Sequence, residues 1–83
     1  MQLLYFGWVR TRIGKGGEEI EPPETVTDVR ALIDWLQSRG DGYAEALADL
    51  TAIRVAVNQE MAELDAGIGR GDEVALFPPM TGG

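Results

Sequence analysis

Two residue types are missing from this sequence of 83 residues: cysteine and histidine. Without cysteine the chain can form no disulfide, bind no metal through thiolates and use no thiolate nucleophile. Without histidine it lacks the side chain that most often serves as a general base and as a transition-metal ligand. These absences argue against a self-contained enzyme, and we expect the chain itself to bind no metal and no cofactor.

Positive charge and long apolar runs are also scarce. The chain has 14 acidic and 7 basic residues and a net charge of −7. Such acidity disfavours nucleic-acid binding, which needs a basic face, and suits either a basic protein partner or simple solubility. No apolar run approaches the roughly 20 residues of a membrane span, and the N-terminal residues show no leader pattern. We therefore expect a cytoplasmic protein that binds neither nucleic acid nor a membrane.

The N-terminal part of the sequence has the composition of a strand. Residues 2–10 are rich in aromatic and branched side chains, which predicts one strand with apolar residues on both faces. Glycines at 14–17 predict a turn, and residues 18–21 predict a short return strand that ends at two prolines.

The next segment carries the helical signal. Val29, Leu32, Ile33 and Leu36 recur at the spacing of one helix face, which predicts an amphipathic helix. Thr27 is the expected N-cap, Gly40 the expected residue after the helix, and Trp35 lies off the apolar stripe.

The second half of the chain alternates between short elements. Residues 43–50 predict a shorter helix, and the alternation at 53–57 predicts a half-buried strand. A turn at 58–60, a short strand at 61–64 and a final strand at 73–77 follow. Strands on both sides of one amphipathic helix predict an α+β domain in which a mixed sheet packs on one main helix.

The C-terminal segment differs from the rest in composition. Pro78 and Pro79 favour an extended path, and Gly82 and Gly83 let an enzyme approach the main chain closely. We therefore divide the chain into a domain at 1–77 and an extended tail at 78–83, which spans about 20 Å. Adenylation of the Gly83 carboxylate by ATP would make it an electrophile that a sulfur nucleophile can convert to a thiocarboxylate. A terminus without function is the alternative interpretation.

Three segments resemble one known family. Residues 71–83 (GDEVALFPPMTGG) resemble the C-terminus of the small subunit of molybdopterin synthase, and residues 55–59 (VAVNQ) and 5–10 (YFGWVR) resemble its strand-turn and its opening strand. The resemblance follows the chain over its whole length. It implies a ubiquitin-like β-grasp fold and a sulfur carrier in molybdenum cofactor biosynthesis.

The resemblance also implies a chemistry and its partners. An ATP-dependent activating enzyme would adenylate Gly83, and a sulfur-transfer system would make the thiocarboxylate. The carrier would then dock on the large synthase subunit, in a heterotetramer, and donate sulfur to cyclic pyranopterin monophosphate. ATP would belong to the activating enzyme, and the catalytic side chains would belong to the large subunit.

The resemblance assigns docking roles by position. Phe6, on the outward face of the first strand, Met61, after the turn, and Phe77, before the prolines, would form an apolar docking surface. Core packing is the alternative for each of them. The partner-binding tail would comprise Pro78, Pro79, Met80, Thr81 and Gly82, with Gly83 as the reactive residue.

Three other functions fit parts of the same pattern. A sulfur carrier of the thiamin pathway would share the fold, the Gly-Gly end and the activation chemistry. A ubiquitin-like modifier would be joined through Gly83 to lysines of other proteins. A β-grasp domain that only binds partners would keep its function without Gly83.

Overall fold

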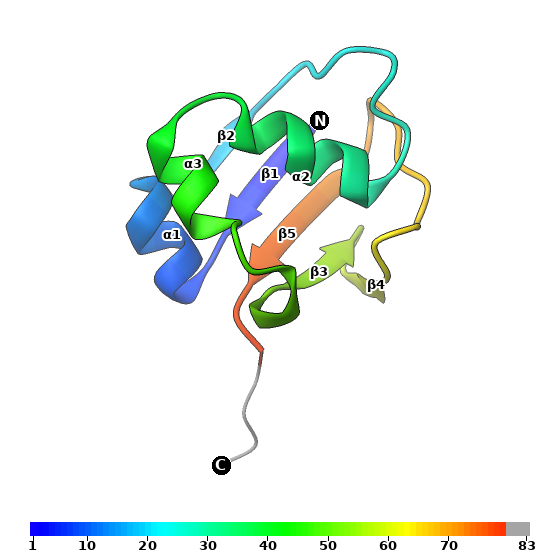
Figure 1. Cartoon of the computed structure of the whole chain (residues 1–83). Helices are drawn as coiled ribbons and strands as arrows, with labels where there is room; N and C mark the ends of the chain where they lie inside the picture. The colour runs from blue at the N-terminus through cyan, green and yellow to red at the C-terminus, as the bar shows by residue number, and fades with distance from the viewer. Residues whose placement is uncertain (80–83) are drawn as a thin grey trace.

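A five-stranded sheet with helices on one face forms the body of the protein (Figure 1). The computed structural model describes residues 1–79. The strands lie in the order β2-β1-β5-β3-β4; β1 runs parallel to β5, and the other neighbours are antiparallel. The elements are β1 (Gln2–Tyr5), α1 (Gly7–Ile13), β2 (Gly17–Glu19), α2 (Val29–Gln37), α3 (Asp41–Ala46), the 3-10 helix η1 (Leu50–Ala52), β3 (Arg54–Val57), β4 (Glu60–Ala62) and β5 (Glu73–Phe77). The expected α+β architecture with a mixed sheet is confirmed.

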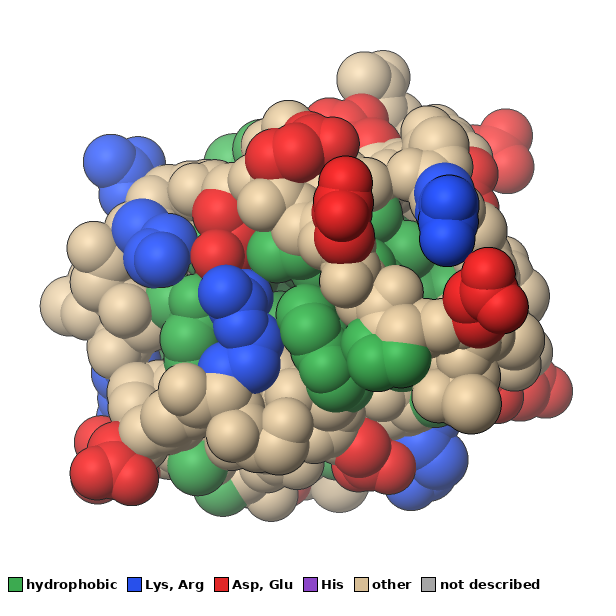
Figure 2. Space-filling view, turned by 90° about the horizontal axis from the view of Figure 1, so that it is seen from above, with side chains coloured by type: hydrophobic (Ala, Val, Ile, Leu, Met, Phe, Trp, Pro, Cys, Tyr) green, Lys and Arg blue, Asp and Glu red, His purple; other side chains and the backbone are tan. Residues whose placement is uncertain are grey.

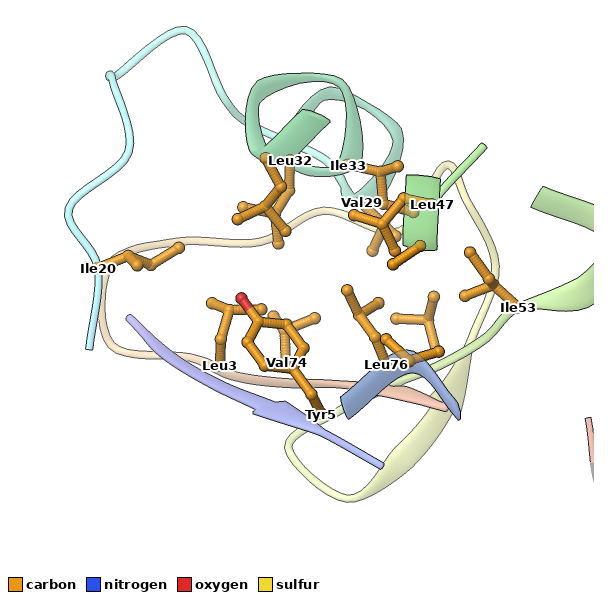
Figure 3. Packing of buried hydrophobic residues seen from close by; sticks show 14 of the residues in the cluster. Leu3, Tyr5, Ile20, Val29, Leu32, Ile33, Leu47, Ile53, Val74 and Leu76 are labelled. Carbon is orange, nitrogen blue, oxygen red and sulfur yellow. The ribbon is translucent and has the colours of Figure 1, made fainter. Parts of the chain in front are cut away.

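The core lies between α2 and the two central strands. The predicted apolar stripe of α2 is confirmed, since Val29, Leu32, Ile33 and Leu36 are all fully buried. In Figure 3, side chains of this stripe point toward side chains that rise from the sheet. Those on the sheet side are Leu3, Tyr5, Val74 and Leu76. Trp35 is half-buried, as its place off the stripe predicted.

The prediction of one strand over residues 2–10 is wrong. β1 ends at Tyr5, and the chain then forms α1. Gly7 has φ +57°, a left-handed conformation that turns the chain out of the sheet, and a Cβ here would lie 2.7 Å from Pro78 Cγ. Val9 is buried because it faces the core from this helix, not from a strand. Phe6 accordingly occupies the N-cap of α1 instead of the outward face of a strand.

The ends of the other two α-helices also differ from the prediction. Asp28, not Thr27, caps α2, because its carboxylate accepts a hydrogen bond of 2.8 Å from the Ala31 backbone N–H. The helix ends before Ser38, and Gly40 instead precedes α3. The helix predicted at residues 43–50 corresponds to α3, which starts earlier and is shorter than predicted.

The hairpin and the last strand were predicted more closely. β3 has the expected alternation, and Asn58 and Gln59 form the turn with φ of 51° and 69°. The short strands were placed one residue late at their starts, since β2 begins at Gly17 and β4 at Glu60. β5 has the predicted bounds, and its Val74 and Leu76 are buried. The division at residue 77 stays a prediction.

Within residues 1–79, no helix combines the length and the apolar character that a crossing of the bilayer requires.

Leu32→Ala tests whether the α2 stripe holds the sheet. Leu32 is fully buried, so the truncation leaves a cavity, and we expect the free energy of unfolding to fall by about 2–5 kcal/mol. Urea denaturation followed by circular dichroism measures the change. Asp34→Ala, an exposed position of the same helix, is the control. Equal stability of the two variants would contradict this description of the core.

Candidate docking site

The end of β5 brings two of the predicted docking residues, Phe6 and Phe77, together. Because Tyr5 pairs with Leu76, the residues that follow these two, Phe6 and Phe77, emerge at the same edge of the sheet. The backbone N–H of Phe6 also donates to the Leu76 carbonyl at 3.1 Å. The root of the tail thus lies beside the start of α1, where Gly7 meets Pro78.

An open apolar hollow of about 470 Å³ occupies this edge. Its lining residues are Phe6, Gly7, Ala75, Phe77, Pro78 and Pro79. The Phe6 side chain is 48% exposed, which core packing does not explain. Hydrophobic side chains exposed around a hollow are typical of a binding surface.

A row of apolar residues extends the hollow across the face of the sheet that the helices leave uncovered. The register places Leu4 opposite Ala75, Ala75 opposite Ala56, and Ala56 opposite Met61. These residues alternate with core residues, so they lie on the open face. Met61, on the edge strand β4, is 67% exposed. The hollow and this row together form what we call the apolar surface.

Polar side chains lie at the other end of the open face. On the open face, Gln2 pairs with Glu19 on one side and with Glu73 on the other, at the end of the strands away from the hollow. Figure 2 looks down on the molecule from the top of Figure 1 and shows hydrophobic side chains bordered by charged ones of both signs. Along the strands, the apolar surface therefore ends before the polar residues Gln2, Glu19 and Glu73.

The structure places only part of the predicted site. It brings Phe6, Phe77, Pro78 and Pro79 together, and it puts Met61 at the far end of the same sheet face. The positions 80–83, with Met80, Thr81, Gly82 and the reactive Gly83, lie outside the described residues. Their roles stay predictions.

The partly buried carboxylate of Glu18 joins four elements, and no local pattern in the sequence predicts this contact. The hydroxyls of Tyr5 and Tyr43 donate to Glu18 Oε2 at 2.8 and 2.6 Å. Arg39 Nη1 and Lys15 Nζ lie 3.1 and 3.5 Å from Glu18 Oε1. The contact links β1, β2, the end of α2 and α3, so it fixes α3 against the sheet edge.

The surroundings of Glu18 determine the pKa values of this cluster. Burial alone would raise the Glu18 pKa, but the hydrogen bonds from Tyr43 and Tyr5 and the charge of Arg39 outweigh it and lower the pKa. Burial, with the adjacent Glu18 carboxylate, raises the pKa of both Tyr5 and Tyr43. The cluster is therefore a stabilising contact and not a proton donor or acceptor poised near neutral pH.

Among residues 1–79, no group of three or more carboxylate side chains is arranged to hold a metal ion. The described geometry offers an exposed apolar surface at the point where the chain leaves the sheet.

Comparison with known proteins agrees with this geometry. A model of the ThiS family matches residues 3–83. The chain belongs to the ThiS family. It is 34% identical to the molybdopterin synthase sulfur carrier subunit of Haemophilus influenzae over 83 residues, which cover 100% of this chain and 99% of the relative. It is 36% identical to the subunit of the same name from Escherichia coli, again over 100% of this chain and 99% of the relative.

Solved structures confirm the ubiquitin-like β-grasp fold of this ThiS-family chain. The small archaeal modifier protein 1 of Haloferax volcanii superposes with a TM-score of 0.74 and 26% identity, over 96% of this chain and 97% of that one. The fold that the sequence resemblance implied is therefore confirmed.

Glu18→Gln tests the Glu18 cluster through the pH dependence of the free energy of unfolding. The folded-state pKa of Glu18 is lowered, so its contribution is present above the ordinary value of 4.5 and is lost as pH falls through the folded pKa. At pH 7 we expect the variant to unfold with about 1.5–3 kcal/mol less free energy than the wild type. Near pH 3 the difference should shrink.

Urea unfolding at a series of pH values measures this difference. Glu63→Gln, an exposed position, is the control and should match the wild type at every pH. A stability difference that stays constant down to pH 3 would contradict the assignment.

Proposed function

We propose that this protein is the sulfur carrier subunit of a molybdopterin synthase. Full-length similarity to two proteins of that name supports the proposal. The structural observation that carries it is the position of the apolar surface. The exposed Phe6 and the hollow beside it lie where the Gly-Gly tail begins, so a partner that binds there receives the tail.

The chemistry belongs to the Gly83 carboxylate. Its oxygen attacks the α-phosphorus of ATP in an activating enzyme, pyrophosphate leaves, and an acyl adenylate forms. A sulfur nucleophile then displaces AMP, which leaves a thiocarboxylate. In the synthase this sulfur passes to cyclic pyranopterin monophosphate, and water restores the carboxylate.

In this scheme the chain presents its C-terminal carboxylate to the activating enzyme and to the large subunit. It contains no histidine and no cysteine, and the partly buried Glu18 is held ionised by its partners. General acids and bases are therefore expected on the large subunit, with two small and two large subunits in the complex. The proposal places these steps, and the activating enzyme that uses ATP, in the cytoplasm.

A ubiquitin-like modifier is the second candidate. The observation that favours it is the likeness to the small archaeal modifier protein 1. A modifier would form amide bonds to lysines of other proteins, which survive denaturation and reductant. The thiamin-pathway carrier and the binding-only domain share the fold but find no further support in the described residues.

Intact-protein mass tests the carrier chemistry. After incubation with ATP, the activating enzyme and a sulfur source from the same cell, we expect a mass gain equal to the replacement of one oxygen by sulfur. A variant that lacks Gly83 should show no gain while it keeps the circular dichroism of the wild type. No gain in the wild type, with an activating enzyme that charges another carrier, would reject sulfur transfer. Lysine-linked adducts in the same reaction would favour the modifier.

Phe6→Asp tests the apolar surface. Phe6 is the N-cap of α1 and makes no side-chain capping bond, so aspartate suits the backbone there and the fold should persist. We expect binding to the large synthase subunit, measured by calorimetry, to weaken at least about 30-fold, because a central aromatic contact is lost.

Thr25→Asp is the matched control for that experiment. Thr25 is exposed in the loop before α2, away from the hollow, and the same charge is introduced. Unfolding of Phe6→Asp would instead assign Phe6 to the core. Unchanged binding would remove Phe6 from the docking surface.

A further inference from the structure

Most basic side chains of this acidic protein lie on or around α1. Four of its seven Lys and Arg residues lie on α1, on the loop after it and in the turn that follows α2. They are Arg10, Arg12, Lys15 and Arg39, and all four are exposed. We call this group the basic patch.

Aromatic rings hold part of this patch in place. The Arg12 guanidinium lies 4.7 Å from the centre of the Trp8 ring. Arg39 lies 5.2 Å from the ring of Trp35 and 5.1 Å from that of Tyr43. Cation–π contacts fix the direction of an arginine without neutralising it, so less side-chain freedom is lost when an anion binds.

The charge of the patch is only partly compensated. Lys15 and Arg39 share the single carboxylate of Glu18. Within residues 1–79, Arg10 and Arg12 form no ion pair. Their position in the last turn of α1 is also favourable for cations, because the helix dipole is negative there.

The patch continues the apolar surface. Phe6 caps α1, and the Arg10 backbone N–H donates to the Phe6 carbonyl at 3.3 Å. Residues four apart lie on one side of a helix, about 6 Å apart along its axis. Beyond Arg10, a shallow hollow of about 310 Å³ is lined by Arg10, Thr11, Gly14, Lys15 and Gly16. A protein seated over Phe6 and Pro78 therefore meets Arg10 within one helical turn.

We propose that the basic patch is a second part of the docking surface and receives an acidic segment, rich in Asp and Glu, of the large synthase subunit. The inference rests on the proposed function, since it uses the same partner. The overall charge of the chain favours a protein segment over nucleic acid as the ligand of the basic patch. The patch has four cations on a chain of net charge −7, and a nucleic-acid site would need a longer basic face.

Association kinetics with the large subunit test this proposal. The double variant Arg10→Glu, Arg12→Glu reverses the two unpaired charges, and Arg30→Glu, Arg70→Glu makes the same change of net charge at exposed positions of α2 and the 69–72 loop. We expect the first variant to associate about tenfold more slowly at low salt and to lose most of the salt dependence of its association rate. The second variant should stay close to the wild type.

Two further measurements make the result decisive. The neutral variant Arg10→Gln, Arg12→Gln, whose fold is checked by urea unfolding, should fall between wild type and the reversed variant. Equal association rates and salt dependence for the patch and control variants would overturn the proposal. So would saturable binding of a fluorescent single-stranded oligonucleotide that only the patch variants lose, with unchanged binding to the large subunit.

Failure of the proposed function gives a different result. If wild-type protein does not bind the large subunit at any salt concentration, the function and the inference fall together. If Phe6→Asp abolishes binding while the patch variants bind at the wild-type rate, only the inference falls.

Discussion

The parallel pairing of β1 with β5 is the constraint on which the rest of this molecule depends. Parallel neighbours need a long connection, and here nearly the whole chain lies between the two strands. Their register makes both strands end at one edge of the sheet, so the turn into α1 and the departure of the tail occur side by side. A shift by one residue would exchange the buried and open faces of β5 and remove Ala75 and Phe77 from the apolar surface.

The two faces of the sheet have different roles. One face is covered by α2 and its neighbours, and the stripe from Val29 to Leu36 packs in the core beneath them. The other face leaves Phe6 and Met61 exposed to water, which costs stability that burial would otherwise provide. The Glu18 cluster offsets part of this cost at the sheet edge, because its bonds hold α3 in place without enlarging the small core. A fold this small can keep an apolar surface exposed only if its remaining contacts are well satisfied.

The sequence predicted elements whose signal is local and periodic. The α2 stripe, the alternation of β3 and the bounds of β5 belong to this group. The prediction for residues 2–10 was wrong because α1 is short and fully buries only Val9, which left its helical pattern weak. The turn at Gly7 has a positive φ, and the nearby Pro78, distant in the sequence, leaves no room for a side chain there. The family resemblance found Phe6, Phe77 and Met61 as docking candidates, but only the strand order shows that the first two share a hollow. The Glu18 cluster was missed because its partners lie up to 25 residues away in the sequence.

Net charge gave the least specific prediction of all, and the reason is geometric. A value of −7 favoured a basic partner for the molecule as a whole. The field that a partner meets, however, is set by the charges near the contact, because screening limits their reach to about 10 Å in ordinary salt. Near Phe6 the basic residue is Arg10, one helical turn along α1, and the acidic Glu19 and Glu73 lie at the other end of the open face. If the proposed function holds, the carrier must dock, deliver sulfur and leave. A modest apolar contact with a charged edge allows this, because charges speed the encounter and a small apolar area keeps dissociation fast.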